Sequence, residues 1–521
     1  MMKTKKIPVH TKNPSLDLAL DTISLGKQAL VFTNMKKSAE KTAEDIAKHL
    51  KKIDERCEAL AKQALEALSS PTKQCERLAF CLRKGIAFHH AGLVAEQRAL
   101  VEDNFRNGTI KIICATPSLA MGVDLPAFRS ILKDVKRYTP RGYAFIPVLE
   151  YLQMAGRAGR PKFDKEGEAI CIASHEGDKK TLFERYVHGK PEEIYSKVAV
   201  EPVLRTYILS LIASQFVASR HDLIQFFEKT FWAHQFQDML KLSLTIDKMI
   251  ALLEEWELID QHSKGDFVSA ADLHDKKLKA TLLGRRVSEL YIDPLTAHNF
   301  ITLMRNASHK KRKLFSYLQM ISDTGEMKPL LRVSMKEEEK IQQLILENSE
   351  SLFGTEPSLY DLEYEDFQNS IKTAAMLQDW AEEKTEEFLL EEYNTRPGEL
   401  RAKLDRADWL VFSAQELCKV LHFQNLLKEL IQARVRLQYG IKEELLALVR
   451  FEGIGRVRSR VLFNNRIRTV KDVKDADISS LSYLVGRQTA IKLKKQVGEE
   501  IKEIPPNKRK GQIRLGDYSE E

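Results

Sequence analysis

Four short apolar runs between residues 28 and 174, separated by segments of helical character, constrain the fold more than any other feature. The runs are QALVFT, IAFHHAG, IKIICAT and EAICIAS, and they have the character of buried parallel strands. Strands that alternate with helices indicate an α/β domain with a parallel sheet. A ligand site is expected at the carboxyl ends of such strands.

Beyond Gly177 the pattern changes to one helical segment after another. Three helical segments, the short apolar stretch GDFVSA and a further helix predict a winged-helix module before residue 290. An all-helical region follows, interrupted at RPGEL, where Pro397 and Gly398 favour a stop and Glu399 suits a helix start. Two short helical segments around glycines precede a tail expected to be unstructured. The predicted domains are therefore residues 1–180, 181–290, 291–445 and 446–503, followed by the tail 504–521.

Composition excludes several classes of protein. A chain of 521 residues is too long for one core, and it contains no apolar run long enough to cross a membrane. Its basic start, MMKTKKIPVHTKN, lacks the apolar region of a secretory signal, so an intracellular location without membrane attachment is expected. The six cysteines have no CxxC spacing and no histidines at metal spacing, so neither disulfides nor a metal site is predicted.

Positive charge is concentrated near the C-terminus. The segment from Arg450 to Lys510 contains 16 Lys and Arg against 7 Asp and Glu, an excess that accounts for the whole net charge of +8. Such an asymmetry predicts a polyanionic partner, most commonly a nucleic acid.

The stretch QMAGRAGRP places Arg157 and Arg160 three residues apart among small residues. A guanidinium offers a planar fork of donors that matches phosphate oxygens, and a glycine such as Gly156 lets backbone approach a ligand closely. The alternative is a solvated basic turn.

The loop CATPSLAMGVDLPAF follows a predicted strand and contains Thr116, Gly122 and Asp124. Its hydroxyl and backbone N–H groups suit a sugar-phosphate backbone, and Asp124 suits a ribose hydroxyl or a partner arginine. The alternative is a strand-to-helix turn in which Thr116 and Ser118 are caps.

Taken in order, LVFTN, AFHHAGL, ATPSLAMGVDLPAF and QMAGRAGRP resemble motifs IV to VI of superfamily-two helicases. Together with FERYVHGKPE and SELYIDPLTA, they are most similar to the archaeal Ski-two-like DNA helicases of the Holliday-junction-migration type, from Leu30 to the C-terminus. The resemblance implies a second RecA-like motor domain followed by winged-helix, helical ratchet and helix-hairpin-helix domains. It also implies 3′-to-5′ unwinding of single-stranded, branched or stalled-fork DNA in repair and recombination.

The resemblance assigns Gln153, Arg157 and Arg160 to catalysis, because motif VI arginines reach the γ-phosphate of ATP held by a neighbouring RecA-like domain. It assigns Gly122, Asp124 and Gly156 to the nucleotide and Thr116 to the DNA backbone.

The sequence contains neither GxxxxGK[ST] nor a DExH box, which in this family lie on a first RecA-like domain. ATP and Mg²⁺ are therefore expected to bind mainly to that domain, supplied by a separate chain, and this chain is expected to be inactive alone. The alternative is a non-enzymatic DNA-binding or regulatory protein that has lost its motor. An RNA helicase of the same branch is a third possibility.

In the resembled family, a hairpin between motifs V and VI wedges the duplex apart, and residues 131–150 fit that place. Its candidate DNA contacts are Arg137, Tyr138, Arg141 and Tyr143, together with Phe145, which supply charge for phosphates and rings for stacking. The alternative is an ordinary sheet hairpin.

The helix starting near Glu399 resembles the family's ratchet helix, in which Trp409 would stack on a base. Ala402 takes the place of the family's usual basic residue, and Arg401 or Lys403 would substitute for it. The alternative places Trp409 in the helical core.

The segment around Gly453 and Gly455 resembles a helix-hairpin-helix whose turn presents backbone N–H groups to a phosphate, with Arg456 and Arg458 adding affinity. A solvated basic face is the alternative. In the tail, Gln512, Leu515 and Tyr518 have the QxxLxxY spacing of a sliding-clamp peptide, although Ser519 stands where a second aromatic is usual.

Overall fold

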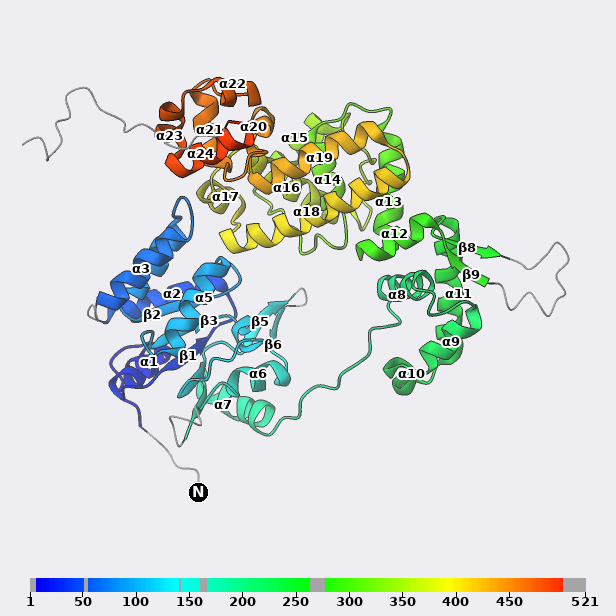
Figure 1. Cartoon of the computed structure of the whole chain (residues 1–521). Helices are drawn as coiled ribbons and strands as arrows, with labels where there is room; N and C mark the ends of the chain where they lie inside the picture. The colour runs from blue at the N-terminus through cyan, green and yellow to red at the C-terminus, as the bar shows by residue number, and fades with distance from the viewer. Residues whose placement is uncertain (1–5, 51–54, 140–141, 160–165, 263–276, 500–521) are drawn as a thin grey trace, which may run out of the picture. The chain divides into compact units, whose positions relative to one another are not determined.

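The computed structural model describes residues 6–50, 55–139, 142–159, 166–262 and 277–499 (Figure 1). The chain forms two compact units. The first unit contains Met1–Tyr195 and Thr385–Lys403, and the second contains Ser196–Lys384 and Leu404–Glu521.

The first unit is built on a parallel sheet, which confirms the predicted α/β class. Its five strands have the order β2-β3-β1-β4-β7, and the first four of these are buried along their length. Their bounds are β1 Ala29–Phe32, β2 Ile86–His89, β3 Ile112–Ala115, β4 Arg129–Leu132 and β7 Glu168–Cys171.

Four of these strands lie within the four predicted apolar runs, but β4 does not. The region predicted as two strands around a turn contains three, because β4 joins the sheet and only β5 (Lys136–Thr139) and β6 (Gly142–Phe145) form the hairpin. The strand β4 begins with the fully buried Arg129, which donates to Asp21, Thr22 and Glu168. A charged first residue breaks the apolar pattern by which the other strands were predicted.

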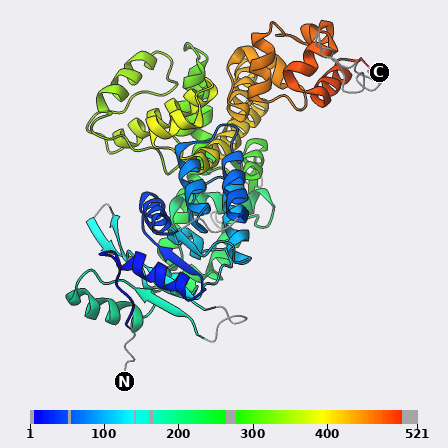
Figure 2. The same ribbon diagram turned by 90° about the vertical axis from the view of Figure 1, so that its left-hand side faces the viewer.

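Seven α-helices accompany this sheet in the described N-terminal part of the first unit. They are α1 Pro14–Ser24, α2 Lys36–Lys48, α3 Glu55–Glu66, α4 Lys73–Leu82, α5 Ala95–Arg106, α6 Val148–Ala155 and α7 Glu176–Leu182. The sequence pattern did not predict the helix α1. The Asn13 side chain caps its start, and Leu16, Leu18 and Ala19 are buried. Figures 1 and 2 show the β5–β6 hairpin extending away from the sheet.

The second unit begins with four helices, a two-stranded antiparallel sheet and a further helix. These are α8 Glu201–Ala213, α9 Arg220–Glu228, α10 Phe231–Phe236, α11 Met239–Glu255, β8 Ile259–His262, β9 Lys277–Ala280 and α12 Leu282–Leu290. The predicted second helix is divided into α9 and α10, because Thr230 caps a new helix start. The stretch GDFVSA lies outside the described residues, and the winged-helix assignment stays a prediction.

Residues 291–445 are helical, as predicted. The helices are α13 Pro294–Ala307, α14 Leu314–Ser322, α15 Glu338–Asn348, α16 Tyr364–Ala381, α17 Glu386–Tyr393, α18 Pro397–Val420 and α19 Gln424–Tyr439. The predicted stop and restart is present: α17 ends before the left-handed Asn394, and α18 starts at Pro397.

The segment after residue 445 contains five short helices around their own buried cluster, where two were predicted. They are α20 Leu446–Val449, α21 Arg456–Asn464, α22 Val470–Asp475, α23 Ile478–Val485 and α24 Arg487–Gln496. Capping side chains of Thr469 and Asp477 start α22 and α23 within a few residues of each other.

All six cysteines are free thiols, five of them buried and Cys171 partly so. Within the described ranges, no helix has both the length and the apolar character needed to cross a membrane.

Candidate functional site

The segment containing Arg157 lies against the loop that follows β3. The Arg157 guanidinium donates to the carbonyl of Ala120, and its Nη1 lies 3.9 Å from Oδ1 of Asp124. The Arg157 side chain is 22% exposed and that of Asp124 is 95% exposed. Two stretches separated by about thirty residues thus meet. The partners of Arg157 named here are a carbonyl and an exposed carboxylate, and neither is a buried carboxylate.

Arg157 lies at the amino ends of the strands rather than at the carboxyl ends, where a ligand site was expected. The N–H of Ala127 donates to the Arg157 carbonyl over 2.9 Å, and that of Gly159 donates to the Ala127 carbonyl over 2.6 Å. Ala127 lies two residues before β4 begins, and Gly159 lies against Gly167, the residue before β7. The physical reason is that α6 connects two parallel strands and so returns toward their starting edge, with Arg157 just after its last residue.

The glycines of this region have different structural roles. Gly122 has a φ of +84° in an exposed loop, a conformation that favours glycine. Gly156 has an ordinary helical conformation. Gly159 has a φ of +98°, and a Cβ on Gly167 would lie 2.5 Å from its Cα. A glycine of this motif was expected to let the backbone approach a ligand closely. At Gly159 the backbone instead lies close to that of Gly167.

Thr116 directly follows β3, at the carboxyl end of the sheet. Its N–H donates to the His89 carbonyl over 3.3 Å, and its hydroxyl lies 2.9 Å from that of Ser118. Thr116 occupies the N-cap of the 3₁₀ turn Pro117–Ala120 without a side-chain capping bond, so the capping alternative is wrong for its hydroxyl. Gln153 is exposed on α6.

The predicted DNA-contacting residues of the hairpin differ in how far the fold engages their side chains. Tyr138 and Tyr143 pair across the strands with ring centroids 5.6 Å apart and are 73% and 79% exposed. Arg137 pairs with the nearly buried Glu150 at 3.0 Å. Phe145 packs on the core beneath Lys136 and Arg185. The two tyrosines therefore remain accessible for stacking.

Trp409 lies half-buried on α18, and its indole N–H donates to the carbonyl of Leu290 over 2.9 Å. The indole N–H of Trp409 is therefore already hydrogen-bonded within the second unit. Earlier on the same helix, about two turns before Trp409, Arg401 is exposed and Lys403 is buried. Of the two basic residues predicted to replace Ala402, only Arg401 has an accessible side chain.

The arginines of α21 differ in how far the fold holds them. Arg456 lies 4.8 Å from the ring centre of Trp380 and donates to the Lys384 carbonyl over 2.9 Å. Arg458 is exposed and donates to the carbonyl of Gly453, over 2.8 Å. Gly453 has a φ of +82°, and Gly455 precedes the first residue of α21.

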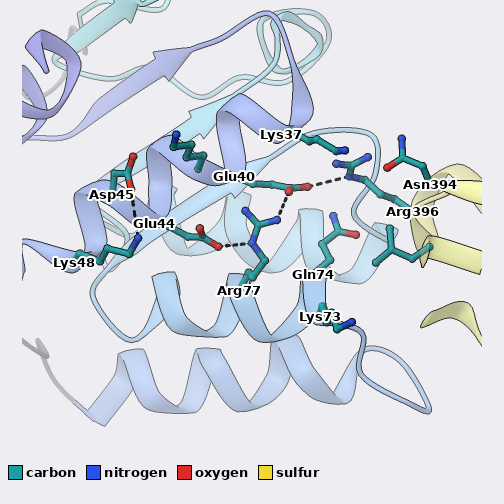
Figure 3. A pocket seen from close by; sticks show the side chains of 12 residues that line it. Lys37, Glu40, Glu44, Asp45, Lys48, Lys73, Gln74, Arg77, Asn394 and Arg396 are labelled. Atoms are coloured by element: carbon teal, nitrogen blue, oxygen red, sulfur yellow. Dashed lines mark hydrogen bonds and ion pairs between the residues drawn. The ribbon is translucent and has the colours of Figure 1, made fainter. Parts of the chain in front are cut away.

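Sequence reasoning missed a buried ionic cluster around Glu40 of α2 (Figure 3). The Glu40 side chain is 2% exposed and accepts from His90 over 3.1 Å, from Arg396 over 2.9 Å and from Arg77 over 2.5 Å. Burial acts to raise the pKa of Glu40, but the hydrogen bonds from His90 and Arg396 dominate and lower it to about 2. Glu40 is therefore charged at neutral pH.

A pocket of about 540 Å³ adjoins the cluster. It is lined by side chains of both signs, including Lys37, Lys41, Glu44 and Asp45, and by the neutral Asn394. The only sequence signals for this region were the AFHHAGL and RPGEL stretches, which supply His90 and Arg396.

Several predicted residues lie outside the described residues. They are Arg160, Arg141 and the clamp-like residues Gln512, Leu515 and Tyr518. In the part of the chain that is described, no three His, Cys, Asp or Glu side chains gather as metal ligands.

Comparison with known proteins identifies two families along the chain. The helicase conserved C-terminal domain matches residues 55–162, and the archaeal helicase domain 4 matches residues 315–440. The first match includes the Thr116 loop and Arg157, and the second includes α18.

Three curated relatives are each named ATP-dependent DNA helicase Hel308. The protein of Methanococcus vannielii is 36% identical over 504 residues, covering 90% of this chain and 65% of the relative. That of Pyrococcus horikoshii is 37% identical, covering 95% and 67%, and that of Methanocella arvoryzae is 36% identical, covering 97% and 67%. The chain thus spans about two thirds of the length of these relatives. The resemblance of the motifs is confirmed, and the chain belongs to the Hel308 family of archaeal superfamily-two helicases.

Proposed function

We propose that this chain supplies the arginine-bearing half of the ATP site and the DNA-translocating elements of a 3′-to-5′ DNA helicase. Its substrates would be single-stranded and forked DNA at branched or stalled forks, in repair and recombination. One observation carries the proposal: Arg157, accessible and loosely partnered, adjoins the loop that contains Thr116 and Asp124.

The residues present fit one side of a nucleotide site. Arg157 retains guanidinium donors that a phosphate can accept, because its partners are a carbonyl and an exposed carboxylate at 3.9 Å. Gln153, Gly122, Asp124 and Gly156 would line the same side, and Arg160 would be the second arginine. When bound, ATP with Mg²⁺ supplies the energy of phosphoryl transfer. Neither Walker A nor DExH occurs in the 521 residues, so a first RecA-like domain must contribute the phosphate cradle and the metal ligands from outside them.

The DNA side of the proposal depends on exposed rings and cations. Tyr138 and Tyr143 present a pair of rings on the hairpin, where they can stack on the last base pair of a fork. Trp409 and Arg401 on α18 would follow the translocating strand. Gly453, Gly455 and Arg458 at the start of α21 would hold a phosphate, supported by the basic C-terminal segment. A sliding clamp would engage Gln512, Leu515 and Tyr518.

The experiment is to measure ATP hydrolysis stimulated by single-stranded DNA for this chain, alone and mixed with a chain bearing Walker A and DExH. Hydrolysis only in the mixture, abolished by Arg160→Ala, is the expected result. A mixture that stays inactive while the chain still binds DNA would replace the proposal with the non-enzymatic DNA-binding alternative.

A further inference from the structure

The first unit is completed by a segment from far along the chain. Residues 385–403 belong to the first unit, although the residues on both sides of them belong to the second. This segment contains α17 and the first residues of α18, and α18 continues to Val420 within the second unit. Among the described helices, α18 is the one that is shared between the units.

The attachment of this segment is ionic and centred on Arg396. Its Nε donates to Oε1 of Glu40 over 2.9 Å, and both side chains are buried, at 7% and 2% exposed. Three residues on, Glu399 accepts from the Arg396 N–H over 3.1 Å and pairs with Lys36 at the start of α2. Figure 3 shows Arg77 and Arg396 approaching Glu40 from different elements.

The backbones of the two stretches lie close together at this attachment. The N–H of Gly398 donates to the Gly92 carbonyl over 3.0 Å. A Cβ on Gly92 would lie 2.3 Å from Cδ of Arg396, and a Cβ on Gly398 would lie 2.2 Å from the Leu93 carbonyl oxygen. The glycines of AFHHAGL and RPGEL therefore let the two stretches pack directly together.

His90 joins the same cluster in its neutral form. Burial lowers its pKa, although Glu40 acts in the opposite direction. Its Nδ1 accepts from the Gly92 N–H over 3.1 Å, so its Nε2 carries the proton that is donated to Glu40. The ring thus connects the backbone at Gly92 to the carboxylate that holds Arg396.

The cluster is also connected to the proposed ATP side. His89, next to His90, accepts from the N–H of Thr116, and the turn after Thr116 ends at Ala120, whose carbonyl accepts from Arg157. A continuous series of hydrogen bonds and short backbone stretches therefore leads from Arg157 to Arg396.

We infer that Arg396, Glu40 and His90 form a latch, by which movement of the Thr116 loop and Arg157 is passed to the start of α18. The latch residues are positioning residues: they would touch neither ATP nor DNA, and they would set how much unwinding each ATP produces. This inference rests on the proposed helicase function and adds to it the residues that link hydrolysis to α18.

The test compares Arg396→Met with a matched control, Arg77→Met, in the mixture that hydrolyses ATP. Arg77 bonds the same Glu40 carboxylate from α4, so its loss also leaves the buried charge short of a donor. Its ion pairs are with Glu40 and Glu44 of α2, whereas Arg396 belongs to the segment 385–403. The measured quantity is the number of base pairs unwound per ATP hydrolysed, with thermal unfolding followed for both variants.

Arg396→Met is expected to lower this ratio about tenfold, and Arg77→Met to leave it within about twofold, at similar losses of thermal stability. Arg396→Lys should recover part of the ratio, because an ammonium group can still bond Glu40. Equal ratios for Arg396→Met and Arg77→Met, in a wild-type mixture that unwinds DNA, would overturn the latch alone. A wild-type mixture that neither hydrolyses ATP nor unwinds DNA would overturn the proposed function, and the latch with it.

Discussion

Arg157 and Arg396 are both arginines of the first unit that lie just outside a helix, yet their surroundings differ sharply. Arg396 is buried against Glu40, a carboxylate that receives three side-chain hydrogen bonds. Arg157 contacts a carbonyl and an almost fully exposed Asp124. An arginine matched to a buried carboxylate is part of the fold, whereas one with weak, exposed partners keeps donors for a ligand.

The same distinction separates neighbours elsewhere. On α21, Arg456 is held by Trp380 and Lys384, whereas the exposed Arg458 donates to Gly453. On the hairpin, Phe145 packs on the core, and Tyr138 and Tyr143 are exposed. Mutations can therefore test whether held and accessible side chains affect different properties.

The largest expected effect is that of Arg157→Ala on turnover. Its loss should lower ATP hydrolysis by the assembled helicase about 10³-fold, because an arginine that stabilises transferring phosphate is worth that much or more. Thermal unfolding of the chain should stay near the wild-type value. A drop in unfolding temperature as large as that of Arg396→Ala would show that Arg157 is held by the fold and would break the comparison.

Glu40 should dominate the acid sensitivity of the first unit. Its pKa in the fold is about 2, below the ordinary 4.5, so its charged form stabilises the fold fully above pH 4.5 and this stability is lost as the pH falls toward 2. The contribution at neutral pH is about 3 kcal/mol of unfolding free energy.

Urea unfolding between pH 7 and pH 2 measures this contribution as the difference between wild type and Glu40→Gln. The wild type should lose the additional stability over that interval, and the variant should not. Parallel pH profiles would mean that Glu40 is not the charged centre of the cluster.

Tyr138→Ala and Tyr143→Ala test the exposed rings. Each should weaken binding to a forked duplex by roughly tenfold, since stacking of a base on an aromatic ring is worth about 1–3 kcal/mol. The unfolding temperatures of both tyrosine variants should be unchanged. The unfolding temperature of Phe145→Leu should fall, because Phe145 packs on the core. Fork affinity is measured by fluorescence anisotropy, and an unchanged affinity for both tyrosine variants would leave the hairpin as an ordinary sheet element.

The smallest effect is expected on α21. Arg458→Ala should reduce the slope of log affinity against log salt by about one, as expected for the loss of one phosphate contact. Arg456→Ala should affect mainly thermal stability, because this side chain is already engaged by Trp380 and Lys384. The reverse result, with the salt slope changed only by Arg456→Ala, would contradict the division between held and accessible arginines.

Much of the fold could be predicted from local pattern. The parallel sheet followed from apolar runs, and the restart at RPGEL followed from Pro397 and Gly398, because both signals act over a few residues. The strand β4 and the helix α1 escaped prediction since Arg129, Asp21 and Thr22 satisfy one another only after folding. Short helices such as α22 depend on single capping residues, which periodicity does not detect.

The site divides in the same way. From the sequence, Asp124 suited either a ribose hydroxyl or a partner arginine, and in the structure Arg157 contacts the loop that contains Asp124. The Glu40 cluster could not be predicted from spacing, because Glu40 and Arg396 are 356 residues apart in sequence. Whether an arginine is held or accessible depends on such distant partners, so the sequence alone does not distinguish Arg456 from Arg458.

The late segment 385–403 has a consequence for the order in which this protein folds during synthesis. Chains fold largely from the N-terminus as the ribosome extends them, and contacts that close long loops form slowly. In the nascent first unit, Glu40 therefore lacks its bond to Arg396, and Gly92 lacks its contacts with Arg396 and Gly398, until about two hundred further residues have emerged. A fragment ending at Tyr195 should be correspondingly prone to aggregation, and adding residues 385–403 as a separate peptide should rescue it.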